Sequence, residues 1–172
     1  CFCKYQQKSK TVEACKQWTK SRMFYHSGAY RQAVESYAEI QKEMRENARF
    51  MFEYGHALHK LHEPELSNKV LKEALKVSGD PMILNIIGKN EQEMKHYESA
   101  EYWFMRAVHR LPGRIYPYYL LANLYADPSF YRRDKLERMV QTVLEKEPKI
   151  QSTAIKQMRR KARELLKKVP EN

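Results

Sequence analysis

Three histidines and three cysteines are the side chains best suited to bind a metal ion. His56, His59 and His62 form an H-x-x-H-x-x-H run, in which the first two residues share one face of a predicted helix. No suitably spaced acid or cysteine completes a set of zinc ligands, so we expect exposed helix histidines and no metal site. The odd number of cysteines, without a disulfide-like framework, favours a reducing compartment, and Cys1-x-Cys3 lacks two further ligands at zinc spacing. These cysteines are Cys1, Cys3 and Cys15.

The sequence contains no motif that indicates an enzyme. It has no glycine-rich phosphate loop, no nucleophile elbow and no pair of carboxylates in a recognisable frame. Gly88-Lys89 lacks the upstream glycine and the following Ser or Thr of a P-loop, and close helix packing explains the glycine better. We therefore expect no catalytic residue and no cofactor in this chain.

Small and large residues recur along the chain with a period of 33 or 34 residues. One layer consists of Ser21, Gly55, Gly88 and Ala122. The next layers are Ala33, Ser67 and Ala100, then Tyr37, Leu71 and Phe104, then Ile40, Ala74 and Ala107. A helix–turn–helix period of this length, with small residues at helix contacts, is typical of tetratricopeptide repeats (TPRs). The alternative is a chance alignment of amphipathic helices, which several layers in phase argue against.

The chain thus resembles a TPR array over about residues 14–148. The resemblance implies an all-α fold, a right-handed superhelix of antiparallel helix hairpins with a C-terminal capping helix. We expect one domain over residues 1–172, with repeats at about 14–47, 48–80, 81–114 and 115–148. We also expect residues 1–13 to extend the first helix, Gly88 to contact Ala100, Val77 to face inward, and Gly113 to form a left-handed C-cap.

A capping helix is predicted at about residues 152–168, starting at Ser152 or Thr153. Its apolar stripe consists of Ile155, Met158, Ala162, Leu165, Leu166 and Val169. Its basic face consists of Lys156, Arg159, Arg160, Lys161, Arg163, Lys167 and Lys168. Such a helix, with one polar face, closes the last apolar layer of a repeat array.

The first helices of TPR hairpins line a concave groove, which is where a partner peptide is expected to bind. Counted from repeat starts at 14, 48, 81 and 115, the fifth positions are Trp18, Phe52, Asn85 and Tyr119. The ninth positions are Arg22, His56, Lys89 and Asn123. Aromatic and cationic side chains are common anchors of protein interfaces, so we predict a groove for an acidic or aromatic peptide. The alternative is that the aromatic residues fill gaps in the core.

One class of TPR domains grips the C-terminal carboxylate of chaperones with a clamp of Lys, Asn and Arg side chains. The clamp positions hold other residues here, namely Trp18, Arg22, Glu53, Met82 and Ile86. A chaperone adaptor is therefore not expected.

The formal charge of +11 lies at the two ends of the chain. Residues 1–22 carry a net charge of +5 and residues 149–172 a net charge of +6, so residues 23–148 are neutral overall. Solvated helix faces explain these charges in the simplest way. An anionic membrane surface is the more specific hypothesis, whereas neutral repeats argue against a nucleic-acid partner.

Several segments resemble the C-terminal tail of bacterial O-antigen ligase/polymerase-like membrane proteins. They are Ser78–Pro81, Asn85–Asn90, Leu111–Ala122, Glu147–Ile155 and the Met158-Arg159-x-Lys161 helix. The resemblance covers about residues 18–168 and implies a soluble repeat domain that lacks the membrane-embedded catalytic loops of that family. A first residue other than Met agrees with a fragment of a longer protein.

The function expected from the sequence is therefore a non-catalytic scaffold that binds a protein or peptide of the lipopolysaccharide machinery. We expect the domain to lie at the inner membrane on its cytoplasmic side, with the periplasm as the alternative. A basic nucleic-acid-binding repeat protein and a stand-alone soluble TPR adaptor are the competing hypotheses. Neither the partner, nor the glycan, nor the oligomeric state follows from the sequence.

Overall fold

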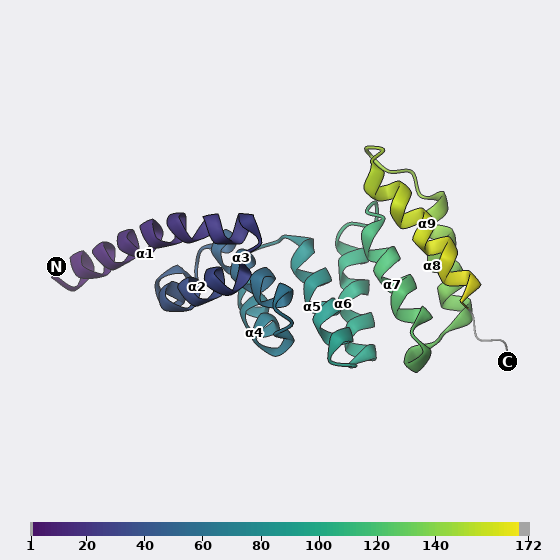
Figure 1. The fold of residues 1–172 in the computed structure, drawn as a ribbon, viewed down its shortest axis with the longest axis horizontal. Coiled ribbons are helices and arrows are strands. Elements are labelled where there is room, and N and C mark those ends of the chain that lie inside the picture. Colours follow the sequence, from purple (N-terminus) through teal and green to yellow (C-terminus); the bar gives the residue numbers. More distant parts are fainter. Residues whose placement is uncertain (1, 169–172) are drawn as a thin grey trace. The chain divides into compact units, whose positions relative to one another are not determined.

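The computed structural model describes residues 2–168, and the side chains of residues 6–168. Within this range the chain forms nine α-helices, one short 3-10 helix and no β-strand (Figure 1). The helices group into two compact units, the first up to Asn90 and the second from Glu91. The unit boundary falls inside α5 (Pro81–Glu93). Cys1 and Val169, which entered the cysteine and stripe predictions, lie outside the described residues.

The first unit consists of two helix hairpins and most of α5. Helix α1 (Phe2–Ser27) pairs with α2 (Tyr30–Met44), and α3 (Ala48–Lys60) pairs with α4 (Pro64–Ala74). Helix α1 is much the longer of its pair and runs past the end of α2 (Figure 1), which confirms the predicted N-terminal extension. Gly28 ends α1 with a φ of 81°, a backbone conformation that glycine adopts without strain.

The repeat layers of the first unit pack as the sequence predicts. Ala33, Tyr37 and Leu71 are fully buried, and Gly55 lies so close to Leu71 that a Cβ atom there would collide with the leucine side chain. The Ser67 hydroxyl donates a hydrogen bond of 2.7 Å to the Gly55 carbonyl, which ties α4 to α3. Val77 is an exception, because it is exposed rather than inward-facing. It follows the end of α4 and therefore no longer shares the helical phase of the stripe.

The second unit consists of α6 (Tyr97–Arg110), α7 (Tyr116–Ala126), a 3-10 turn (Pro128–Phe130), α8 (Arg133–Glu145) and α9 (Thr153–Lys167). Its core is built from Phe104, Leu121, Leu136 and Val140, with Ala162 of α9 buried against it. Asp127 accepts a hydrogen bond of 2.9 Å from the Ser129 amide and thereby starts the 3-10 turn. Helix α9 packs on both α7 and α8, which is the position expected of a capping helix.

Three details of the second unit differ from the sequence predictions. Gly113 does not adopt a positive φ, because α6 already ends at Arg110 and Leu111, at φ −138° and ψ 78° before Pro112, leaves the helical conformation. Leu166 is exposed and lies outside the buried stripe of α9. Arg159 belongs to the α7–α8 side of α9 and not to its basic face. Its guanidinium donates hydrogen bonds to the carbonyls of Val143 and Lys146 and so caps the C-terminal end of α8.

Ser152 is the residue that caps α9, since its hydroxyl accepts a hydrogen bond of 3.3 Å from the Ile155 amide.

The expected contact between Gly88 and Ala100 involves residues of both units and stays a prediction, as does the continuation of the two units as a single domain. Among residues 2–168, no helix combines the length and the apolar character that a membrane span requires.

Candidate peptide-binding surface

Glu53 is the central polar group of the first unit, although its sequence position indicated only a mismatch to the carboxylate clamp. Its side chain is almost completely buried on α3. The indole nitrogen of Trp18 donates a hydrogen bond of 3.0 Å to its Oε2 atom, and the Tyr37 hydroxyl donates another of 3.1 Å. Arg22 contacts Oε1 at 2.9 Å, and Arg49 contacts the same atom at 3.3 Å. This carboxylate therefore links α1, α2 and α3.

Trp18 and Arg22 thus lie together on α1, as predicted, but their polar groups are occupied. The Arg22 guanidinium lies 5.2 Å from the centre of the Trp18 ring and is ion-paired with Glu53. Only about a quarter of the Arg22 side chain is exposed. Trp18 also makes an edge contact with Phe50 of α3. Both residues therefore contribute to packing between α1 and α3 as well as to the surface.

Phe52 and His56 form the second part of the predicted site. Their rings stack at a centroid distance of 5.9 Å, and the His56 Nδ1 atom is hydrogen-bonded to the Tyr25 hydroxyl at 2.7 Å. Burial lowers the pKa of His56 to about 4, with Lys60, His59 and Lys89 adding to the shift through their charges. His56 is consequently a neutral ring at pH 7 and not the cation that the ninth-position pattern suggested.

Burial also affects the other ionisable groups around this ring. Burial and the negative charge of Glu53 raise the pKa of Tyr25 to about 12, and burial lowers the pKa of Lys89.

His59 Nδ1 is hydrogen-bonded to Asn90 of α5 at 2.7 Å, and Asn90 donates to Ser67 and Asn68 of α4 at 2.8 Å each. Polar contacts therefore join α1 to α3, through Tyr25 and His56, and α3 to α5, through His59 and Asn90.

The expectation of exposed histidines is wrong for His56 and His59, which are partly buried and hydrogen-bonded. The third histidine, His62, follows the end of α3 and adopts a φ of 57°, so it does not continue the helical face. Among the described residues, no group of three or more His, Cys, Asp or Glu side chains is arranged to hold a metal ion.

Asn85 lies on α5 and is almost completely buried. Its amide nitrogen contacts the Met82 sulfur at 3.7 Å, whereas its carbonyl oxygen makes no hydrogen bond among the described residues. Tyr119 and Asn123 belong to the second unit, on α7, where the Asn123 side chain donates a hydrogen bond of 2.8 Å to the Tyr119 carbonyl. That these two residues continue the surface of the first unit stays a prediction.

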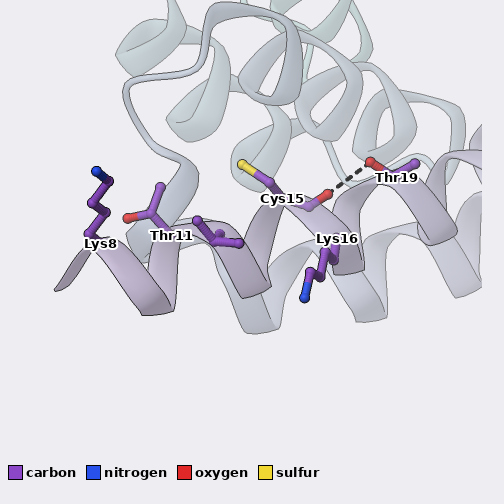
Figure 2. A pocket seen from close by; sticks show the side chains of 6 residues that line it. Lys8, Thr11, Cys15, Lys16 and Thr19 are labelled. Atoms are coloured by element: carbon purple, nitrogen blue, oxygen red, sulfur yellow. Dashed lines mark hydrogen bonds between the residues drawn. The ribbon is translucent and has the colours of Figure 1, made fainter. Parts of the chain in front are cut away.

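Helix α1 carries a second exposed surface near its N-terminal end. Figure 2 shows Lys8, Thr11, Cys15, Lys16 and Thr19 along this stretch, and Val12 lies among them with half of its surface exposed. The Thr19 hydroxyl donates a hydrogen bond to the Cys15 carbonyl, and the Cys15 thiol faces the Met44 sulfur of α2. The face therefore combines lysines with a small apolar area.

Because the pKa of the partly buried His56 ring is lowered, we expect the protein to lose stability in mild acid. The unfolded state binds a proton near pH 6.5 and the folded state only near pH 4, so the stabilisation is present above pH 6.5 and is lost as the pH falls toward 4. We expect His56→Gln to remove on the order of 2 kcal/mol of this pH dependence. Urea unfolding of both proteins at pH 7 and pH 4.5 measures the difference. Equal pH dependence of the two proteins would contradict the neutral, buried ring.

Comparisons with known proteins reveal similarity only at the level of structure. No protein-family model matches the sequence, and no curated protein matches it. A crystal structure of MamA, a TPR-containing protein, is similar with a TM-score of 0.66 at 18% identity, covering 86% of this chain and 91% of MamA. MamA from Desulfovibrio magneticus RS-1 has a TM-score of 0.66 at 15% identity, covering 86% and 76% of the two chains. Another MamA structure has a TM-score of 0.59 at 17% identity, covering 92% and 89%.

These similarities establish the fold class. The chain is an all-α protein of the TPR type, as the period of its small and large residues predicted. Identities below one fifth show the fold alone, so the functional assignment depends on the residues described above.

Proposed function

We propose that this chain is a protein-interaction domain that binds an acidic or aromatic peptide along the first helices α1, α3 and α5. The observation that carries the proposal is that hydrogen bonds join the three helices that bear Trp18, Phe52 and Lys89, and that the His56 ring, on which Phe52 stacks, also experiences the charge of Lys89. Each of these side chains is partly exposed, so a partner can contact it without any rearrangement of the helices. TPR arrays provide extended concave surfaces of this kind.

Electrostatics favours an acidic peptide over a basic one. The charge of Glu53 is balanced by Arg22 and Arg49, which leaves Lys89 as the cation that burial has partly desolvated. A carboxylate from a partner would stabilise the charged form of Lys89, because an opposite charge nearby favours ionisation. Phe52 stacked on the neutral His56 ring supplies an apolar surface beside it.

The test uses Phe52→Ala and Lys89→Ala, with Lys69→Ala on the exposed face of α4 as the matched control. The probes are fluorescein-labelled twelve-residue peptides that combine glutamate with phenylalanine, and fluorescence anisotropy measures their affinity. We expect each variant of the surface to weaken binding by about tenfold while the control binds normally. Unchanged affinity in both variants would contradict the proposal. Tighter binding of a single-stranded RNA would favour the nucleic-acid alternative.

Arg22→Ala is a poorer probe than the sequence suggested. Its removal also leaves the buried Glu53 with one fewer cation, so a loss of binding would be mixed with a loss of stability. Phe52 and Lys89 avoid this difficulty, because neither is ion-paired with Glu53.

We also propose that the domain is the C-terminal part of an O-antigen ligase/polymerase-like membrane protein of lipopolysaccharide biosynthesis. The proposal is supported by the sequence resemblance of Leu111–Ala122 and Glu147–Ile155. The coding sequence upstream of Cys1 tests it. Several apolar runs of about 20 residues would support such a parent, and their absence from the complete open reading frame would overturn it.

The α1 face around Lys8 and Lys16 supports a further proposal, a cytoplasmic domain held against an anionic membrane surface. Lysines beside the exposed Val12 can contact lipid phosphates while the valine contacts the interface. The purified domain should pellet with anionic vesicles and not with neutral ones, and the binding should fade as salt rises. Equal, negligible pelleting with both vesicles would reject the proposal. A periplasmic signal from a C-terminal reporter fusion would reverse the topology.

A further inference from the structure

The second unit contains an apolar cleft that shares no residue with the surface described above. Its volume is about 520 Å³, within the range of small-ligand and side-chain pockets. The cleft lies between the α6–α7 loop and the α8–α9 loop together with the first two turns of α9. Its apolar lining includes Leu111, Ile115, Tyr116, Ile150, Ile155 and Met158.

The rim of this cleft leaves large apolar side chains in water. Ile150 is 78% exposed and Leu111 is 38% exposed, although most apolar residues of the unit are buried. Ile150 lies in the loop before α9, where nothing in the repeat pattern demands an isoleucine. Exposed apolar groups that gather around a hollow mark a contact site for another molecule.

The charged side chains of the lining all have the same sign. Arg114 and Lys149 are both exposed and lie on opposite loops, whereas the lining contains no Asp or Glu. Glu147 is near in sequence but does not line the cleft. An apolar hollow between two cations is complementary to a ligand with an aliphatic group beside a carboxylate.

We propose that this cleft binds a short acidic peptide segment of a partner protein, in which aliphatic side chains alternate with carboxylates. The aliphatic side chain fills the hollow between Ile150 and Ile155, and the flanking carboxylates contact Arg114 and Lys149. A peptide is favoured over a long acyl chain because the apolar rim is exposed to solvent. The 78% exposure of Ile150 means that an extended chain lying there would remain largely in water.

The experiment measures binding of a fluorescein-labelled peptide of alternating leucine and glutamate to the full chain. The matched probe has lysine in place of each glutamate. We expect binding of the acidic peptide only, weakened about tenfold by Ile150→Ser and by the double variant Arg114→Glu, Lys149→Glu. These residues are exposed, so the variants should unfold at the same temperature as the natural sequence.

Two control variants locate the binding. Lys156→Glu reverses a single charge on α9 outside the lining and should leave the affinity unchanged. Lys89→Ala is the second variant: if it abolishes binding of this peptide while Ile150→Ser binds normally, the peptide lies on the first unit and this inference is overturned. Equal binding of both peptides would overturn it too. Dodecanoate binding that exceeds peptide binding would assign the cleft to an anionic amphiphile instead.

Discussion

Replacing Glu53 with alanine is expected to lower the free energy of unfolding by about 3–5 kcal/mol, because breaking a buried ion pair leaves its partners uncompensated. The substitution removes the acceptor for the Trp18 indole and the Tyr37 hydroxyl and the counter-charge of Arg22. Tyr37 is fully buried and has no access to water, so its hydroxyl loses a hydrogen bond that solvent cannot replace. Urea unfolding followed by circular dichroism measures the loss.

The double variant Glu53→Met, Arg22→Met separates the role of charge from the role of packing. Replacing both partners of a buried ion pair by apolar groups is often close to neutral, so the double variant should recover the part of the loss that comes from the uncompensated Arg22 charge. The part that comes from the Trp18 and Tyr37 donors should remain, because they still lack an acceptor. Glu73→Ala is the matched control, because Glu73 forms an exposed pair with Lys76 and its loss should change stability by less than about 1 kcal/mol. A loss no larger for Glu53→Ala than for Glu73→Ala would contradict the central role of this carboxylate.

The fold was predictable because it depends on a pattern that repeats. Ser21, Gly55 and Ala122 share one phase of a period of 33 or 34 residues, and a helix hairpin can return to the same packing position only if small residues recur there. The layer of Tyr37, Leu71 and Phe104, all of which are fully buried, follows from the same period. Each repeat thus confirms the phase of the others, and the sequence carries this information several times.

Side-chain contacts that occur in only one repeat could not be predicted from the period. Glu53 and Arg159 both looked like ordinary charged residues on a helix, yet one is a buried acceptor for four donors and the other caps the end of α8. The available signal for Glu53 was an acid among Phe50, Met51 and Tyr54, one repeat after Trp18 and Arg22. A charge within an apolar run requires a partner, and its identity depends on side-chain directions that periodicity does not specify.

The repeat count predicted which of these side chains are neighbours, but it did not predict their chemistry. Counting from the repeat starts placed Trp18 and Arg22 beside each other on α1, and Phe52 and His56 on one face of α3. The same count treated Arg22 and His56 as available cations. The structure instead pairs Arg22 with Glu53 and partly buries the His56 ring, which is why our proposal assigns the contact with an acidic partner to Lys89.

The effect of Gly55→Ala is expected to reverse in sign when Leu71 is shortened. In the natural sequence a Cβ atom at position 55 would collide with the Leu71 side chain, which is fully buried and cannot move aside freely. Overpacking of this kind costs about 1–3 kcal/mol, which outweighs the gain of up to about 1 kcal/mol from replacing glycine by alanine in a helix. The single variant should therefore be less stable than the natural chain.

Leu71→Ala alone should cost about 2–5 kcal/mol, because it empties a buried site between α3 and α4. In that background the added methyl group of Gly55→Ala enters the vacated space, and its helix propensity is gained without a collision. The double variant should thus be more stable than Leu71→Ala, and a double-mutant cycle from urea unfolding measures the coupling between the two positions. Additive effects would show that α3 and α4 do not approach as closely as the Gly55–Leu71 contact requires, and would contradict the helix packing from which the whole repeat register derives.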